Sequence, residues 1–245
     1  MSQSVTEVKL TNAGVIFSVC VEFVNRECFI SNEALSKLLR EPVYCIGCGR
    51  TDAGVHAKQF YLHFDTSQEI TDNFVFKLNR FLGFDFAIFQ LIKVHENAHS
   101  RFDAFSRTYE YHMHFNENPF NTRLSGFVYP KPDLQKMVDA APIVMDYSDF
   151  KPLCKTHESK TNICHIYRSD IRVAEDGYSL IYTISANRFL RNMVRMTTGC
   201  LIMIGQGKME PDYFREVMGE VGVFKYIMPV PACGLYLTSV KYPYL

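Results

Sequence analysis

Several short stretches of the chain alternate between apolar and polar residues, which is the pattern of β-strands that bury one face. In residues 57–64 one face carries Lys58 and then three apolar residues, whereas the other carries Gln59, Tyr61 and His63. We expect the first face to meet helices and the second to meet something polar. The predicted strands are Val15–Val24, Val43–Ile46, Ala57–Phe64, Phe86–Val94, Arg107–Phe115, Ile163–Val173, Tyr178–Ser185 and Leu235–Val240.

Between these strands, apolar residues recur every three to four positions, which indicates helices with one buried face. The predicted helices are Asn32–Arg40, Thr71–Leu82, Leu134–Met145, Arg188–Gln206 and Pro211–Gly219. Several strands follow one another through short connections, such as the segment AEDG before Tyr178, and short connections favour antiparallel pairing. The pattern therefore predicts an α+β fold rather than a doubly wound parallel sheet.

The order of the predicted elements repeats loosely along the chain. Residues 1–100 read as strand, helix, strand, strand, helix and strand, and residues 105–245 follow a similar order. Self-similarity of this kind points to related structural units even where the sequences differ. We predict two similar halves, residues 1–103 and residues 104–245.

The composition is that of an ordinary globular protein, with 47% hydrophobic and 21% charged residues among 245. Lysine plus arginine equals aspartate plus glutamate at 26 each, so any surface for nucleic acid must be local. No apolar run approaches the length of a membrane helix and the first ten residues lack the apolar core of a signal peptide, so we expect a cytoplasmic protein. The eight cysteines are expected to be reduced and mostly buried thiols.

A local basic surface is predicted on the helix that begins near Arg188. At about 100° per residue, the apolar side chains gather on one side and a basic stripe forms on the other. The stripe contains Arg188, Arg191, Asn192, Arg195 and Gly199. No acidic residue occurs in 187–207 to pair with these arginines along the helix. Two interpretations stay open: a solvated basic face, or arginines that meet phosphates or a buried carboxylate.

The most promising carboxylate is Asp52, in the segment GCGRTDAGVHA at 47–57. This segment resembles a dinucleotide-binding loop, but Asp52 occupies the third glycine position, where its charge would repel a pyrophosphate. Cys45 and Cys48 lie too far along the chain from the histidines of HENAH, at 95–99, to read as a zinc finger. Asp52 is therefore the best candidate nucleophile or base.

Four segments occur in a fixed order and resemble the bacterial form of the tRNA pseudouridine synthase A family. They are GRTDAGVHA at 49–57, SRFDAFSRTYEY at 100–111, RFLRNMVRMTTGCLIMIGQGK at 188–208 and PACGLYLTSVKYP at 231–243. Four ordered motifs are much harder to meet by chance than one. The resemblance runs from near Leu39 to the end of the chain.

The resemblance implies isomerisation of uridine to pseudouridine at positions 38 to 40 of the tRNA anticodon stem-loop. It implies no cofactor and no metal. It also implies two α+β halves, related by a pseudo-twofold axis, whose mainly antiparallel sheets join across a central basic cleft. Family members act as homodimers in which one tRNA touches both subunits.

The resemblance also assigns roles to individual residues. Asp52 matches the catalytic aspartate, Tyr109 the active-site tyrosine, Arg195 the arginine that pairs with the aspartate, and Leu235 the apolar residue that flanks the base. Contacts with the substrate are implied for Arg50, Thr51, His56, Arg107, Arg188 and Arg191. Whether the aspartate attacks carbon or removes the 2′ proton is not decided by these matches.

The chain departs from the family near its start. Residues Val15–Ser31 lack the tyrosine-aspartate-glycine strand end and the G-x-Q segment that the family carries there. An alternative hypothesis follows, in which the protein binds or folds tRNA but has lost catalysis. A third hypothesis, an unrelated carboxylate hydrolase, requires a second acid near Asp52, and the motif offers none nearby in sequence.

Overall fold

The computed structural model describes residues 13–21, 27–82, 86–154, 161–175 and 177–245, with side chains from residue 32 onward. The strands are β1 (Ala13–Val21), β2 (Ile46–Gly47), β3 (His56–Thr66), β4 (Phe86–Lys93), β5 (Ser106–His114), β6 (Gly126–Phe127), β7 (Ile166–Val173), β8 (Ser179–Ala186) and β9 (Leu235–Lys241). The α-helices are α1 (Glu27–Leu39), α2 (Phe74–Leu82), α3 (Leu134–Ala140), α4 (Met193–Gly205) and α5 (Pro211–Gly219). Short 3₁₀ turns occupy Pro119–Asn121, Ala141–Asp146, Lys151–Leu153 and Ala232–Gly234.

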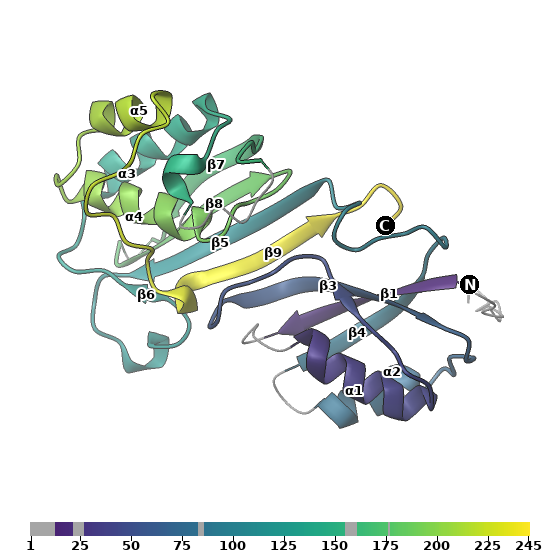
Figure 1. The fold of residues 1–245 in the computed structure, drawn as a ribbon. Helices are drawn as coiled ribbons and strands as arrows, with labels where there is room; N and C mark the ends of the chain where they lie inside the picture. Colours follow the sequence, from purple (N-terminus) through teal and green to yellow (C-terminus); the bar gives the residue numbers. More distant parts are fainter. Residues whose placement is uncertain (1–12, 22–26, 83–85, 155–160, 176) are drawn as a thin grey trace, which may run out of the picture.

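The strands form one mixed sheet in the order β4-β1-β3-β9-β5-β8-β7, with β2 beside β3 and β6 beside β5 (Figure 1). The named strand pairs are antiparallel except β3–β9 and β5–β6. The last strand of the chain, β9, therefore lies between β3 from the first part and β5 from the second. The α+β fold class is confirmed.

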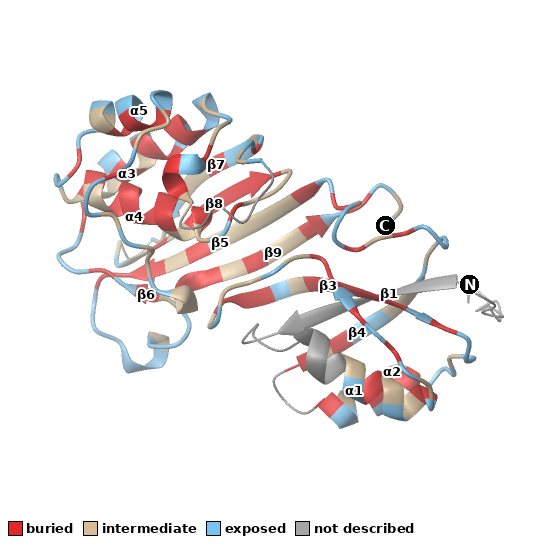
Figure 2. Cartoon of the chain, in the orientation of Figure 1, coloured by how far each residue is buried: buried red, intermediate tan, exposed pale blue. Residues whose placement is uncertain are grey.

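Helices cover the sheet at both of its ends. Helices α1 and α2 lie beside β1, β3 and β4, whereas α3, α4 and α5 gather over β5, β7 and β8 (Figure 1). Two separate clusters of buried side chains accompany these groups, one around Leu35, Phe60 and Leu78 and one around Tyr111 and Leu201 (Figure 2). The boundary at residue 103 and the similarity of the halves stay predictions.

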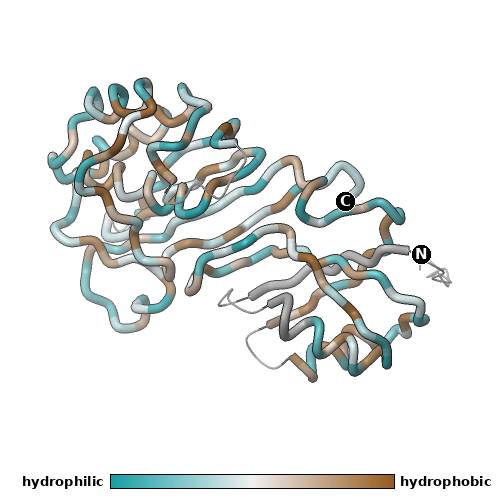
Figure 3. Tube along the Cα trace, in the orientation of Figure 1, coloured by the Kyte–Doolittle hydropathy of each residue, from teal (hydrophilic) through white to brown (hydrophobic). Residues whose placement is uncertain are grey.

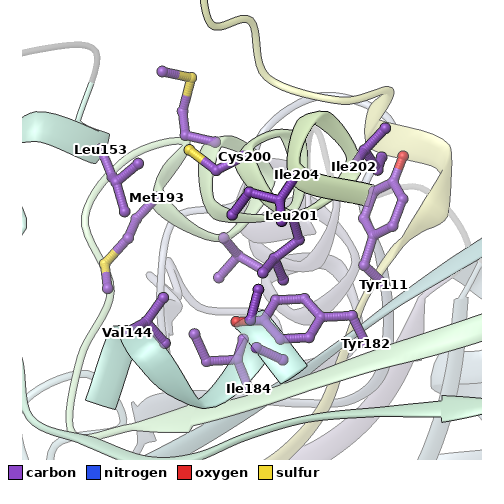
Figure 4. Close-up of a cluster of buried hydrophobic side chains, with 14 of the residues drawn as sticks. Tyr111, Val144, Leu153, Tyr182, Ile184, Met193, Cys200, Leu201, Ile202 and Ile204 are labelled. Atoms are coloured by element: carbon purple, nitrogen blue, oxygen red, sulfur yellow. The ribbon is translucent and has the colours of Figure 1, made fainter. Parts of the chain in front are cut away.

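The second cluster fixes α4 against the sheet. Tyr111 of β5 and Tyr182 of β8 are fully buried and lie beneath the apolar side chains of α4, including Leu201 (Figure 4). The Tyr111 hydroxyl donates to the backbone carbonyl of Pro231 at 2.9 Å, so its polar atom is satisfied within the apolar cluster. This packing sets the position of the first turn of α4, which carries Arg195.

Most predicted elements agree with the structure to within a few residues, and helix Pro211–Gly219 agrees at both ends. The predicted strand Val43–Ile46 is misplaced, because β2 covers Ile46–Gly47 and the next residue, Cys48, still donates its N–H to the Tyr61 carbonyl. The predicted helix Leu134–Met145 is too long as an α-helix: α3 ends at Ala140 and a 3₁₀ turn follows. Pro142 explains the change, since proline has no N–H to donate and its ring clashes with the carbonyl four residues earlier.

The two faces of β3 differ as the alternation predicts, with one refinement. Phe60 and Leu62 pack into the cluster that includes residues of α1 and α2. The opposite face is covered by the chain itself, because His63 Nδ1 lies 2.8 Å from Ser100 Oγ and the Tyr61 ring meets Tyr242 edge-on. The polar neighbour of this face is thus the segment 95–105 and the carboxyl-terminal residues.

Six cysteines have described side chains, and four of them, Cys45, Cys48, Cys164 and Cys200, are buried. Cys20 and Cys28 lie outside the described side chains. Within the described ranges, no cluster of three metal-ligating side chains occurs, and no helix is long and apolar enough to cross a membrane. Hydrophilic residues predominate in the loop 116–125, which projects from the sheet near β6 (Figure 3).

The packing at Gly234 yields a stability prediction. A Cβ atom there would lie 2.6 Å from Cζ of Tyr111 and 2.7 Å from the carbonyl oxygen of His112. Neither neighbour can move freely, so we expect Gly234→Ala to lower the free energy of unfolding by about 1–3 kcal/mol in urea denaturation. Gly49→Ala is the control, because a Cβ at Gly49 has no atom within 4 Å. Equal stability of the two variants would contradict the close packing at Gly234.

Candidate active site

The carboxylate of Asp52 is held at a tight turn just before β3. The Asp52 carbonyl accepts a hydrogen bond from the Val55 N–H at 3.2 Å, and Gly54 has φ of +81°. A positive φ at the third position of a turn favours glycine, which explains the glycine of TDAG. The Asp52 side chain is 23% exposed, so it remains reachable from solvent.

Arg195 reaches this carboxylate from the first turn of α4. Its Nη1 lies 2.9 Å from Asp52 Oδ2, and its Nε donates to the Val230 carbonyl at 2.7 Å. The Val230 N–H in turn donates to the Arg195 carbonyl at 3.3 Å. The Arg195 side chain is only 15% exposed. The backbone of Val230 therefore holds the guanidinium in place, and Nη1 of that guanidinium faces Asp52.

The prediction of one helix that carries the whole basic stripe is wrong for residues 188–192, which precede the helix. Helix α4 begins at Met193, and Asn192 has φ of +62°, a left-handed conformation that asparagine tolerates better than most residues. Arg188 and Arg191 therefore lie in the loop before the helix. Arg191 still approaches the site, because its Nε is 3.8 Å from Asp52 Oδ1 while its side chain is 55% exposed.

Gly199 lies on the second turn of α4, where close approach was expected. A Cβ at Gly199 would lie 2.9 Å from the Met228 carbonyl oxygen. The segment 227–230 thus runs directly against α4 and brings Val230 to Arg195. The close approach at Gly199 is made by the chain itself.

Tyr109 lies on β5 and is partly buried, with the ring of Phe189 edge-on to it at a centroid distance of 5.2 Å. Burial raises the pKa of the Tyr109 hydroxyl well above its usual range, and the Cys48 thiol and the Asp52 carboxylate raise it further. The hydroxyl therefore keeps its proton at neutral pH. Phe189, which packs on Tyr109, lies in the loop that also carries Arg191, so Tyr109 adjoins the candidate site.

Leu235, the first residue of β9, is buried and pairs with Tyr111 across the strands. It belongs to the cluster under α4, and Tyr109 packs against that cluster. The structure thus brings Tyr109 of β5 and Leu235, the first residue of β9, to the cluster beneath the helix that carries Arg195.

The guanidinium of Arg107 donates to backbone carbonyls of the protein itself. Its Nη1 donates to the carbonyls of Ala104 and Asn187 at 3.1 and 3.0 Å, and its Nη2 donates to those of Cys48 and Arg101 at 2.9 and 2.7 Å. These four bonds join three separate segments of the chain. A substrate contact by Arg107 stays a prediction, and its visible role is to hold these segments together.

The other residues of GRTDAGVHA take three different positions. Arg50 is exposed. The Thr51 hydroxyl oxygen is buried and has no hydrogen-bond partner among the described residues. His56 is 3% exposed, with Nε2 2.9 Å from the Arg123 carbonyl and its ring stacked on Tyr236 at 4.5 Å. His56 thus anchors the loop 116–125, and its contact with a substrate stays a prediction.

Val230 escapes sequence reasoning, and Asn192 was predicted only as a member of the basic stripe, without its role as an acceptor. Val230 acts through its carbonyl and N–H, which leave no signal in the side-chain pattern. Asn192 also accepts from Arg195 Nη1 at 3.3 Å, and the only signal is that asparagine favours left-handed positions before a helix. Arg195 is thus oriented by three oxygen acceptors, on Asp52, Val230 and Asn192.

Comparison with known proteins identifies the class to which the chain belongs. The family model described as tRNA pseudouridine synthase matches residues 146–243, which include Arg195 and Leu235. A protein named tRNA pseudouridine synthase A from Bacteroides fragilis is 40% identical over 221 residues, covering 89% of this chain and 86% of the relative. Proteins of the same name are 43% identical in Parabacteroides distasonis, over 86% of this chain and 84% of the relative, and 33% identical in Burkholderia multivorans, over 86% and 78%.

The chain is therefore a member of the tRNA pseudouridine synthases by class. Within that class it belongs to the tRNA pseudouridine synthase A family, since relatives of that name match most of its length. The resemblance found in the four motifs is confirmed.

The geometry around Asp52 predicts unequal coupling to its two arginines. Residues in direct contact couple by about 0.5–3 kcal/mol, whereas exposed ion pairs contribute about 0.2–1 kcal/mol. A double-mutant cycle of Asp52→Ala with Arg195→Ala should give a larger coupling free energy in urea unfolding than a cycle with Arg191→Ala. Equal couplings would contradict the assignment of Arg195 as the main partner.

Proposed function

We propose that this protein isomerises uridine to pseudouridine in tRNA, at positions 38 to 40 of the anticodon stem-loop. One observation carries the proposal: the Asp52 carboxylate, on a side chain that is 23% exposed, lies 2.9 Å from the guanidinium of Arg195. The relatives named tRNA pseudouridine synthase A, up to 43% identical among those described above, support the reaction and the substrate.

The reaction needs few groups from the protein. The C1′–N1 bond of the uridine breaks, the freed uracil turns, and a C1′–C5 bond forms. C5 then loses its proton and N1 gains one, so the product contains the same atoms as the substrate. A carboxylate beside the ribose and a group that handles the C5 proton are sufficient for this sequence, and no cofactor is required.

Asp52 is the carboxylate in this proposal. It begins the reaction either by attack on C1′ or by removal of the 2′ proton, and both routes require that its oxygen faces the ribose. Arg195 binds one carboxylate oxygen, Oδ2, and so fixes the direction of the other. Arg195 is thereby a positioning residue that also balances the negative charge of Asp52 when phosphates approach.

Tyr109 serves the base in this proposal. Its ring provides a surface for stacking on uracil, and its hydroxyl handles the C5 proton. Because burial keeps the hydroxyl protonated at neutral pH, it accepts the C5 proton only as it gives up its own. Leu235 provides the apolar side chain that flanks the uracil stacked on Tyr109.

The target uridine must leave the helical stack to reach Asp52, at a cost of a few kcal/mol. Arg50 and Arg191 are exposed beside the site and are suited to bind the phosphates of the flipped nucleotide. We propose further substrate contacts for Thr51, His56, Arg107 and Arg188. Two of these residues also hold the protein together, because His56 bonds the Arg123 carbonyl and Arg107 bonds the Cys48 carbonyl.

The proposal extends to the setting of the enzyme. We place it in the cytoplasm as a homodimer, with two similar halves whose sheets join across a basic cleft that receives one tRNA. The alternative of a tRNA-binding module without catalysis has no support in the comparisons, because the relatives that match most of the chain are named as synthases.

The first test is tritium release from tRNA carrying C5-tritiated uridine. Asp52→Ala should lower the rate by at least about 100-fold, because the residue that starts the reaction is lost. Asp72→Ala replaces an exposed aspartate before α2 and should keep the wild-type rate. Equal release by wild type and Asp52→Ala would contradict the catalytic assignment.

The second test separates the ring of Tyr109 from its hydroxyl. Tyr109→Phe should lower kcat by about 100- to 10,000-fold and leave the Kd for tRNA unchanged, since only proton transfer is removed. Tyr109→Leu should also weaken binding, because the stacking surface is lost. A wild-type kcat for Tyr109→Phe in single-turnover assays would remove the hydroxyl from the mechanism.

A further inference from the structure

A tight turn at His99–Asp103 presents two exposed side chains, Arg101 and Phe102. The turn is held from within, because the Asp103 N–H donates to the His99 carbonyl at 3.1 Å and His99 Nδ1 lies 3.1 and 3.3 Å from the backbone nitrogens of Arg101 and Phe102. The Tyr244 hydroxyl donates to Asp103 Oδ2 at 3.0 Å. The turn is thus preorganised, and its tip faces solvent.

The position of this turn is fixed by Arg107. One guanidinium nitrogen of Arg107, Nη2, donates both to the carbonyl of Arg101 and to that of Cys48, while Nη1 bonds the carbonyl of Asn187. Cys48 lies four residues before Asp52 in the sequence, and Asn187 begins the loop that carries Arg188 and Arg191. The turn therefore lies beside both loops that form the candidate active site.

The charge at the tip of the turn is positive. The Asp103 carboxylate is turned inward, where Oδ2 accepts from the His99 N–H and from Tyr244. Arg101 is exposed, and its guanidinium lies over the ring of Phe102 at 5.8 Å. Phe102 is 75% exposed, and its inner side leans on His99 at a centroid distance of 4.3 Å.

We propose that Arg101 and Phe102 form a second RNA contact beside the active site, in which Phe102 stacks on an unpaired base and Arg101 binds a phosphate. This inference rests on the proposed function. An exposed aromatic ring beside an arginine is the arrangement that binds unpaired bases without sequence preference. The base concerned is a neighbour of the reacting uridine, because the turn is joined by Arg107 to both active-site loops.

Stacking and charge predict different effects on tRNA affinity. Phe102→Ala should raise the Kd for tRNA about 5- to 100-fold, the loss expected for one stacked base, without changing the dependence of Kd on salt. Phe102→Trp should retain affinity and Phe102→Leu should not, since leucine is apolar but cannot stack. Arg101→Ala should reduce the slope of log Kd against log salt by about one, as one phosphate contact is lost.

Matched controls come from α2, which carries Phe76, 68% exposed, and Arg80, also exposed. Phe76→Ala and Arg80→Ala should bind tRNA like wild type, and thermal unfolding should show that all variants are folded. Wild-type affinity and salt slope in the Phe102 and Arg101 variants, with tritium release by the wild type intact, would overturn this inference alone. Failure of the wild type to release tritium would overturn the proposed function instead.

The alternative to RNA at the surface of Arg101 and Phe102 is a second copy of the chain. Sedimentation of wild type and Phe102→Ala at equal concentration separates the two. Unchanged self-association together with weaker tRNA binding supports the RNA contact. Loss of self-association in Phe102→Ala would assign the surface to a subunit interface and overturn the inference.

Discussion

The ion pair between Asp52 and Arg195 is the interaction on which the candidate site depends. The two residues are 143 positions apart, and their contact at 2.9 Å requires that a turn before β3 and the first turn of α4 meet. Neither side chain could be so little exposed without a partner, because an unpaired charge at partial burial is costly. The backbone of Val230 and the side chain of Asn192 complete the arrangement by fixing the guanidinium.

Continuity of the sheet brings these distant segments together. Strand β9 pairs with both β3 and β5, so the last strand connects the part that carries Asp52 with the part that carries Tyr109. Arg107 makes the same connection outside the sheet through its four carbonyl acceptors. The site is thus built at a junction, where elements from the whole chain must be in place before the carboxylate is positioned.

The fold class and the order of the elements could be predicted because alternation and helical periodicity are strong in β3, β5 and α5. The basic stretch without acids left a solvated face, phosphates and a buried carboxylate open as partners, and the family resemblance implied the pairing of Asp52 with Arg195. The start of α4 could not be predicted, because the left-handed residue Asn192 leaves no trace in hydrophobic periodicity. The support from Val230 was equally hidden, since it comes from backbone atoms. The substrate contact predicted for Arg107 rests on the family motifs, whereas its carbonyl partners lie in three separate segments that no local sequence pattern brings together.

Single-turnover tritium release by Arg195→Met, with Arg191→Met as the matched variant, tests the central claim most directly. Both arginines lie near Asp52: Arg195 Nη1 is 2.9 Å from Oδ2 with its side chain 15% exposed, whereas Arg191 Nε is 3.8 Å from Oδ1 with its side chain 55% exposed. The account predicts that Arg195→Met binds tRNA and remains folded yet loses at least about 100-fold in rate, whereas Arg191→Met loses mainly affinity. A wild-type rate in Arg195→Met at saturating enzyme would contradict the account.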